Sequence, residues 1–309
     1  MTPARLCNAV VIGAAVLLAS CGQGGDGRSA DPAPSAPPAA TPAPSAAAAP
    51  QALVDPNPLA LPSRTLALDK GGRVFTVSEP MLAGLKLGST LVLYAATVVG
   101  FDGELLVIEN KNGPSYKVHP AYAIAVPDSV SLRPGDPVLT EHNGVMRHAV
   151  VKKHVKDRVT VRFLGGESRL GEIALKNARF VRQVDGLQPG NFAALGDEET
   201  LRHVLLVSPF EDGGEKKWLV LGAGGAAMIV AERALEAIPV KYQPRAGTAV
   251  LAEHNGVLRK ATITGATEPG VFTVKYERAG RPATVGWGFV MPLAQEKPPA
   301  GSGSSSRRK

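Results

Sequence analysis

Short stretches with the pattern of β-strands recur along the chain. Between Arg158 and Phe163 every second residue is apolar, so one face of the stretch is hydrophobic and the other is polar. This period of two is that of a β-strand, whose successive side chains point to opposite faces. Further short strands are predicted at 137–141, 145–151, 218–221 and 271–276. The pattern therefore predicts a protein built mainly of β-strands.

One segment occurs twice in the chain. Residues 135–149 read GDPVLTEHNGVMRHA and residues 247–261 read GTAVLAEHNGVLRKA, an offset of 112 residues. Each copy contains an Asn-Gly pair, which tolerates the positive φ angles of a type I′ hairpin turn. The two predicted hairpin corners consist of Glu141, His142, Asn143 and Gly144, and of Glu253, His254, Asn255 and Gly256. Self-similarity of this kind predicts a tandem architecture.

A shorter signature opens each predicted unit. It occurs at Lys86-Leu87-Gly88, Arg133-Pro134-Gly135, Gln188-Pro189-Gly190 and Arg245-Ala246-Gly247. These positions divide the chain into units at 84–128, 133–183, 187–240 and 245–293, after an N-terminal extension at 61–83. We expect a mainly β fold of four tandem small five-stranded barrels arranged A-B-A′-B′, because closure into barrels removes exposed strand edges.

The repeated pattern, a Gly-x-x-Val-Leu strand, an Asn-Gly turn and a Val-x-Val-x-Phe/Tyr strand, resembles the Tudor-like and Src-homology-three-like small barrels. The resemblance covers units two and four well, unit three partly and unit one loosely. It implies an aromatic cage for a methylated cation. This chain departs from that pattern, because Met146 and Leu258 stand where the family often has an aromatic residue. We interpret Phe163, Tyr276 and Trp287 as barrel core, with the polar tips of Tyr276 and Trp287 facing outward as candidate binding groups.

The first residues predict export and lipid anchoring. Arg5 precedes an apolar run at 9–19, which is too short to span a bilayer and suits a signal peptide. The run ends in Leu18-Ala19-Ser20-Cys21, which resembles the bacterial lipobox. The resemblance implies removal of residues 1–20 and acylation of Cys21, and Gly22 favours the outer membrane of a Gram-negative envelope. The other cysteine, Cys7, falls in the segment expected to be removed.

Two further segments have the composition of disordered chain. Residues 21–60 are rich in Pro, Ala and Ser and bury too little apolar area to offset their ordering entropy. At about 3 Å per residue, they would form a stalk of up to roughly 100 Å. The tail at 297–309 is expected to be disordered as well.

The positive charge is concentrated in one stretch. The chain carries a formal charge of +7, and residues 135–182 carry +5 whereas residues 183–246 carry −3. The basic residues singled out are Arg147, Lys152, Lys153, Lys156, Arg158 and Arg162. They form an ordinary solvated strand face, or bind an anionic glycan, or face the acidic groups at 197–199 and 211–212 across a contact between units. The patch is too modest for a dedicated nucleic-acid binder, so no nucleic-acid partner is expected.

The sequence predicts no metal, no cofactor and no enzymatic activity. His142, His148 and His154 are evenly spaced, but a metal site needs three or four converging ligands, and the second copy keeps only His254. The glycines at 222–225 lack the Gly-Lys-Ser/Thr of a phosphate loop, so we expect a turn there.

We therefore expect a non-catalytic, membrane-anchored envelope lipoprotein that binds an envelope protein or an anionic glycan through its barrels. The alternatives are a structural spacer or assembly scaffold, and a hydrolase whose site has no known signature. The observations behind the leading hypothesis are the lipobox, the stalk and the duplicated hairpin.

Overall fold

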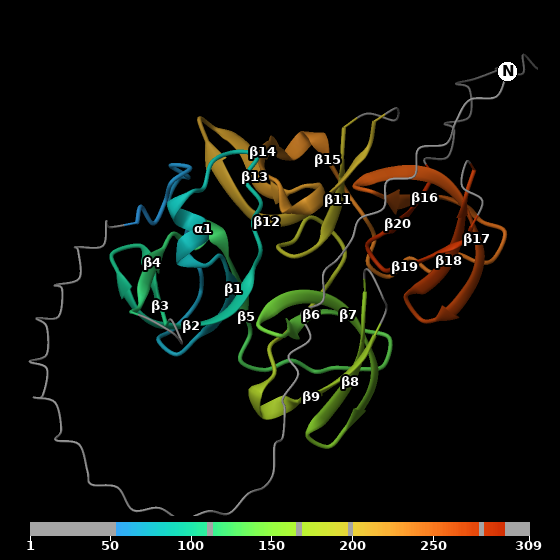
Figure 1. Cartoon of the computed structure of the whole chain (residues 1–309), viewed down its shortest axis with the longest axis horizontal. Helices are drawn as coiled ribbons and strands as arrows, with labels where there is room; N and C mark the ends of the chain where they lie inside the picture. The colour runs from blue at the N-terminus through green and yellow to red at the C-terminus, as the bar shows by residue number, and fades with distance from the viewer. Residues whose placement is uncertain (1–53, 110–113, 165–168, 197–199, 278–280, 294–309) are drawn as a thin grey trace, which may run out of the picture. The chain divides into compact units, whose positions relative to one another are not determined.

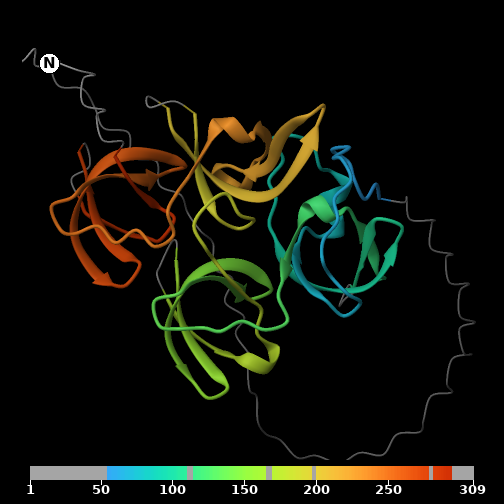
Figure 2. The same ribbon diagram turned by 180° about the vertical axis from the view of Figure 1, so that it is seen from behind.

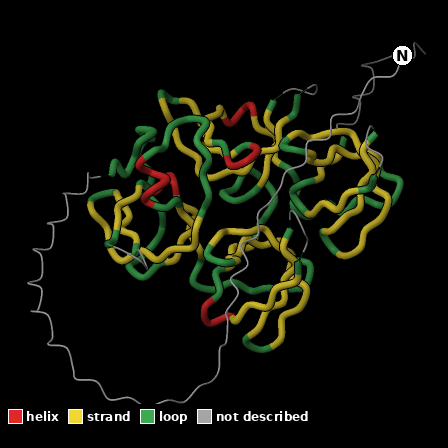
Figure 3. The backbone as a smooth tube through the Cα atoms, viewed as in Figure 1, coloured by secondary structure: helices red, strands yellow, loops and turns green. Residues whose placement is uncertain are grey.

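The computed structural model describes residues 54–109, 114–164, 169–196, 200–277 and 281–293. They belong to one compact unit of the chain, Ala52–Lys309. The predicted signal peptide at 1–20, Cys21, the tail at 297–309 and the acidic residues at 197–199 lie outside the described residues. The fold is mainly β, as predicted. Among the described residues it has one short α-helix, α1 (Glu79–Ala83), and four short 3-10 helices, η1 (Pro120–Tyr122), η2 (Leu175–Asn177), η3 (Ala223–Gly225) and η4 (Glu232–Ala234), among strands and loops (Figure 3).

The strands fall into four consecutive groups of five, which we call sets one to four (Figure 1). Set one comprises β1 (Arg73–Thr76), β2 (Tyr94–Asp102), β3 (Leu105–Ile108), β4 (Tyr116–Val118) and β5 (Ala123–Val126). Set two comprises β6 (Pro137–His142), β7 (Val145–Val155), β8 (Arg158–Phe163), β9 (Leu170–Ala174) and β10 (Phe180–Arg182). Set three comprises β11 (Phe192–Leu195), β12 (Arg202–Asp212), β13 (Glu215–Leu221), β14 (Ala227–Ala231) and β15 (Leu235–Ala237). Set four comprises β16 (Ala249–His254), β17 (Val257–Glu268), β18 (Val271–Tyr276), β19 (Ala283–Gly286) and β20 (Val290–Pro292).

All four sets have the same strand order. In each, the fifth strand pairs with the first, and the first to fourth strands follow as an antiparallel meander. A single pairing of Tyr94 with Val145 joins sets one and two into a ten-stranded sheet, and Arg202 with Val257 joins sets three and four into another. The two sheets are therefore built alike, which confirms the repetition predicted from the sequence.

The strands curl strongly within each set, as the two opposite views show (Figure 2). The second strand of every set carries a β-bulge, after Val98, Val151, Leu206 and Ile263. A bulge bends its strand and increases the local twist. Among the described residues, however, the fourth and fifth strands of a set do not pair with each other. The hydrogen-bonded ladders therefore stop short of closed barrels.

A turn with a left-handed glycine docks the start of three sets where it was predicted. Gly135, Gly190 and Gly247 have φ angles of 86–88°, and each donates its N–H to the carbonyl of the bulged residue of its own set. In set one, Gly71 makes this bond instead, to Val98 at 2.7 Å. The sequence signature at Gly71 was missed, and set one begins before residue 84 because β1 pairs with both β2 and β5.

The predicted signature at Lys86-Leu87-Gly88 has another role. Gly88 donates to the carbonyl of Ala227 at 2.8 Å, and Ala227 donates back to Ser89 at 2.9 Å. Leu91 also donates to Gly225. The segment thus forms the same turn, but it pairs with the edge of set three, because β1 already occupies the equivalent place in set one.

Residues 54–60 correct a second expectation. Their composition predicted disorder, yet Leu59 donates its N–H to the hydroxyl of Tyr122, and that hydroxyl donates to Asn57. His119 also donates its N–H to the carbonyl of Pro56 at 3.0 Å. Tyr122 is fully buried, and Leu59 packs on the core of set one. Two specific partners in set one therefore order a segment that composition alone assigns to the stalk.

The apolar cores connect the sets to one another. Sets two, three and four each have a core of their own. The core of set one continues into Val207, Leu219 and Ala227 of set three. Two further clusters join set two to set four and set three to set four. No helix among the described residues is both long and apolar enough to cross a bilayer.

Candidate functional site

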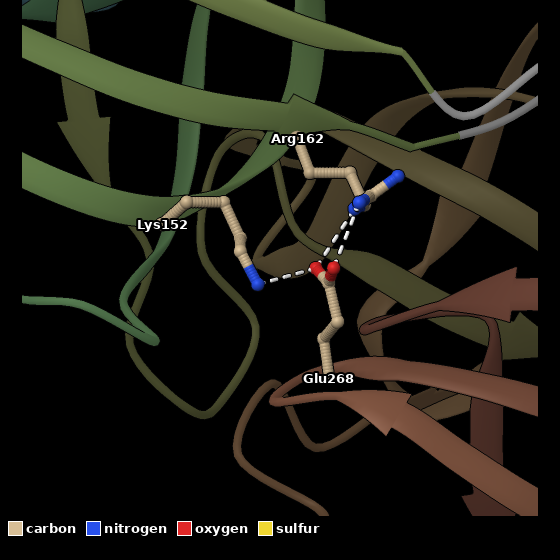
Figure 4. A network of polar contacts seen from close by, with 3 residues as sticks. All are labelled: Lys152, Arg162 and Glu268. Atoms are coloured by element: carbon tan, nitrogen blue, oxygen red, sulfur yellow. Dashed lines mark hydrogen bonds and ion pairs between the residues drawn. The ribbon is translucent and has the colours of Figure 1, made fainter.

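Two of the predicted basic residues converge on one carboxylate (Figure 4). Arg162 contacts Glu268 through two nitrogens, Nε to Oε2 at 2.8 Å and Nη2 to Oε1 at 2.7 Å. Lys152 Nζ lies 2.6 Å from Oε2 of the same residue. The hydrogen bond from Arg162 and then that from Lys152 lower the pKa of Glu268. Because the three side chains come from β7, β8 and β17, this network connects set two to set four.

This network agrees in part with the prediction of a contact between units. A basic face of set two does meet an acid of another set, but the acid is Glu268 of set four and not the acidic group of set three. Asp212 of that group pairs with Lys217 inside set three, with Nζ and Oδ2 2.8 Å apart. The other predicted acids at 197–199 lie outside the described residues.

The remaining basic residues are dispersed. Arg158 pairs with Glu172 of the neighbouring strand, and both side chains are more than half exposed. Arg147, Lys153 and Lys156 are exposed and make no ion pair with any residue that the structure describes. The predicted patch of six cations therefore contains three that are already paired and three that face solvent.

Tyr276 and Trp287 are interior residues, with 5% and 2% of their surface exposed. Tyr276 donates its hydroxyl to the carbonyl of Glu253. Trp287 donates its indole N–H to the carbonyl of Ala149 at 3.1 Å, which connects set four to set two. The expectation that their polar tips face outward was wrong, because buried backbone carbonyls in the adjoining strands accept both hydrogens.

The repeated Glu-His-Asn-Gly sequence forms the same hairpin corner twice. Asn143 and Gly144 have φ angles of 52° and 80°, and Asn255 and Gly256 have 53° and 80°, which confirms the predicted turn. The ring of His142 lies 4.5 Å from that of Phe163, and His254 lies 4.8 Å from Tyr276. The histidines thus pack locally on the third strand. The described residues contain no group of three side chains placed to hold a metal ion.

The two hairpins dock in the same way on the preceding set. Ala95 donates its N–H to Gly144, and Met146 donates to Leu93, both at 2.8 Å. At the equivalent positions, His203 donates to Gly256 and Leu258 donates to Leu201, both at 2.9 Å. We call these the first junction, between sets one and two, and the second junction, between sets three and four.

The first junction is polar. It contains a cavity of about 450 Å³ lined by Tyr94, Thr97, Glu109, Glu141 and Arg179, among others. Arg179 donates to Glu141 at 2.7 Å and to the hydroxyl of Thr97 at 3.3 Å. One guanidinium therefore bridges the two sets.

The second junction contains a cluster of aromatic rings. Phe192 lies between two imidazoles, with ring centroids 4.3 Å from those of both His148 and His203. Phe289 packs beside it at 4.8 Å, and Trp287 lies 5.3 Å from His148. We call these five residues the ring cluster. Because they come from sets two, three and four, the cluster joins three sets.

Both imidazoles of the ring cluster are held neutral. Nε2 of His148 is 2.9 Å from the carbonyl of Gly190, and Nε2 of His203 is 2.8 Å from that of Gly288. Burial lowers the pKa of His148 to about 4, and it also lowers the pKa of His203. A neutral imidazole that donates through Nε2 satisfies each of these carbonyls.

All four sets meet beside the ring cluster. Two cavities, of about 440 and 300 Å³, share Phe192, Leu205, Leu221, Gly222 and Phe289 as lining residues. The smaller cavity also reaches Leu91 and Leu93 of set one and Met146 and His148 of set two. The lining residues that the two cavities share are apolar, whereas His203 and Glu253 line only the larger cavity and Arg147 and His148 only the smaller one.

Comparison with known proteins gives no family assignment. No family model matches this chain, and no curated protein matches it. Sequence reasoning had missed Phe192, His203 and Phe289, which form the centre of the second junction. The available signal was His203, a polar residue next to an apolar run at 204–207. Its partners are brought to it only by the packing of the sets.

Proposed function

We propose that the chain is a non-catalytic, lipid-anchored envelope protein whose four sets act as one rigid head, as a spacer or assembly scaffold. Each set is proposed to be a small barrel of the Tudor-like or Src-homology-three-like kind. Cys21 is proposed to carry the lipid, with the Pro-rich stretch as the tether. The proposal favours scaffolding over independent binding modules, because half of the groups expected to bind partners make contacts inside the head: Lys152, Arg162, Tyr276 and Trp287.

The observation that carries the proposal is the bonding between sets. Sets two and four share the Glu268 network and the Trp287 bond to Ala149. Sets one and three share the backbone bonds of Gly88 with Ala227. Domains that act independently usually have small, polar interfaces and move relative to one another. Apolar clusters that span several sets favour a single body instead.

Calorimetry of the full chain tests the rigid head, with Cys21→Ser used to keep the protein unacylated. We expect one transition whose calorimetric and van't Hoff enthalpies agree. Phe192→Ala removes the central ring and should cost about 3–5 kcal/mol. It should lower the midpoint of the whole transition. Phe101→Ala, at a residue 47% exposed, is the control and should change little. Several independent transitions, of which Phe192→Ala moves only one, would contradict the proposal.

Metabolic labelling with a palmitate analogue tests the anchor. We expect label on the full chain and none on Cys21→Ser, because the lipobox resemblance places the acyl groups on that cysteine. Cys7→Ser serves as the control and should retain the label. Label that persists in Cys21→Ser would refute the anchor and leave the rigid head untouched.

A second function, binding of an anionic glycan, is favoured by the exposed cations Arg147, Lys153 and Lys156. Polygalacturonate is a suitable probe. Binding should weaken with salt and fall when the three residues are changed to Ala, because exposed charges are screened by ions. Lys117→Ala, at a cation that pairs with Asp102, is the control and should leave binding unchanged. Equal binding by the triple variant and the control would exclude this function.

A further inference from the structure

The open end of set two contains a cavity of its own, of about 320 Å³. We call it the mouth of set two. Its apolar side is formed by Phe163, Ile173 and Ala178, and its polar side includes Thr140, Glu141 and Glu172. Binding pockets of roughly 300–1,000 Å³ with an apolar lining and a few placed polar groups are typical small-molecule sites. The mouth is at the lower end of that range, so it suits one ring.

At the equivalent end of set four, a side chain makes a hydrogen bond across the opening. Strand register aligns Phe163 with Tyr276, because each faces the equivalent alanine, Ala149 or Ala261. The additional hydroxyl of Tyr276 donates to the carbonyl of Glu253, at the hairpin corner. Phe163 has no such group, and no described residue of set two makes the equivalent hydrogen bond to the hairpin corner.

At two further aligned positions, set two has a smaller or a more polar residue than set four. Gly171 corresponds to Ala283, and Arg179 corresponds to Phe289. A Cβ atom on Gly171 would lie 2.5 Å from the ring of Phe163, so glycine is required for the ring to stay where it is. The smaller residue and the polar residue are thus both in set two, where they give the mouth its space and its chemistry.

The mouth contains polar groups whose hydrogen-bonding capacity is unused. Thr140 is fully buried and lines the cavity, and its hydroxyl has no hydrogen-bond partner among the described residues. Nε of Arg179, another lining residue, is likewise without a described partner. A buried polar group without a hydrogen-bond partner destabilises the folded protein. The aligned residue of set four, Ala252, avoids that cost. Because this cost occurs in set two and not in set four, it points to a role for the hydroxyl of Thr140.

The charges around the mouth are balanced. Glu141 pairs with Arg179 at 2.7 Å, and Glu172 pairs with Arg158 at 2.8 Å. A charged ligand would have to compete with one of these pairs. A neutral ligand that offers both donors and acceptors would not.

We propose that the mouth of set two binds a single neutral, hydroxyl-rich ring, such as one sugar residue. Thr140 and Arg179 supply hydrogen bonds, and Phe163, Ile173 and Ala178 contact the apolar face of the ring. The residues that line the mouth all belong to set two, although Glu141 and Arg179 also take part in the first junction.

Titration of the full chain by amide NMR tests the site. The probes are D-glucose, D-galactose and N-acetyl-D-glucosamine, each at about 10 mM, where millimolar dissociation constants are detected. We expect at least one probe to shift the amides of residues 140–143 and 171–173. Methyl glycosides form a second arm. If the methyl glycosides still bind, the site accepts a blocked anomeric oxygen and therefore the end of a glycan chain. If they do not bind, the site takes a free sugar.

Thr140→Val separates a binding role from a structural one. It removes only the unpaired hydroxyl, so the protein should be as stable or more stable, while the dissociation constant should rise about tenfold, as for the loss of one hydrogen bond. Thr284→Ala, which removes an exposed hydroxyl from set four, is the control and should leave the dissociation constant unchanged. No shift with any probe, or equal binding by Thr140→Val, would overturn the proposal.

Discussion

The two junctions have the same backbone hydrogen bonds and opposite side-chain chemistry. Ala95 at the first corresponds to His203 at the second, and Arg179 corresponds to Phe289. The hairpins dock alike because their main-chain groups do the docking. The side chains then decide the outcome: a bridging guanidinium beside a cavity in one case, and the ring cluster in the other. A duplicated fold can therefore keep the same hairpin docking in both halves, while only one of the two junctions contains the ring cluster that joins three sets.

Exchanging the chemistry of the junctions gives the largest expected effect. Phe289→Arg places at the second junction the residue that the first has. We expect a loss of about 3–5 kcal/mol, because the ring contacts of Phe289 with Phe192 and His203 are lost, and an ion pair of the new guanidinium with Glu253, the counterpart of Glu141, would not replace them. Urea unfolding measures the change. Phe289→Leu is the control and should cost about 1–2 kcal/mol. Equal costs for the two variants would show that the region is open to solvent.

Acid should weaken the second junction and leave the first unaffected. The pKa of His148 is about 4 in the folded protein, below its ordinary value, and that of His203 is lowered too. The neutral forms stabilise the fold fully above about pH 6.5. This stability is lost as the pH falls from there towards 4, since the unfolded chain takes up protons first. The loss from His148 should reach about 2 kcal/mol at pH 5 and about 3 kcal/mol at pH 4.

The titratable neighbours of the two imidazoles are Arg147 and His203 around His148, and Glu253 around His203. Arg147 opposes protonation and Glu253 favours it. Urea unfolding at pH 7.5 and 5 measures the dependence. His148→Phe should reduce it, whereas His142→Phe, outside the ring cluster, should not. If the stability of His148→Phe falls with pH as much as that of the unaltered protein, the pH dependence does not arise from His148.

Glycine at the two hairpin corners allows a matched test of packing. Gly144 and Gly256 share a φ of 80°, so replacement by Ala costs the same backbone strain in both. A Cβ on Gly256 would lie 2.3 Å from that of Ala223, whereas one on Gly144 meets nothing within 4 Å. Gly256→Ala should therefore be less stable than Gly144→Ala by about 1–3 kcal/mol. Equal unfolding midpoints would mean that the second junction is loosely packed.

The smallest effect is expected at the first junction. Arg179→Met removes the bond to Thr97 and the ion pair with Glu141, which is partly exposed. We expect a loss of about 1 kcal/mol in urea unfolding, since such pairs contribute little net stability. Glu172→Ala, which breaks a more exposed pair in the same set, is the control and should cost less. A loss as large as that of Phe289→Arg would make the two junctions equivalent.

The sequence determined the local structure well. Alternation located strands such as β8, and the Asn-Gly pairs predicted both turns, because these depend on the conformation of a few adjacent residues. The repeat also predicted two similar halves. The lipid anchor at Cys21, the sugar-like ligand and the scaffold role stay predictions. Composition misplaced the start of the ordered chain, since Leu59 and Asn57 are fixed by a tyrosine more than 60 residues away.

Only the tertiary structure decided which polar and aromatic residues meet. For Lys152 and Arg162 the sequence left open a solvated face, a glycan-binding face or a contact between units, and it predicted an outward polar tip for Trp287. The packing of set four against set two determined the partners of all three. Lys86-Leu87-Gly88 had the signature of a set opening, yet its strand partner lies in set three. The physical reason is that turns and periodicity are encoded by neighbours in the chain, whereas an ion pair or a ring contact depends on which of four similar surfaces face each other.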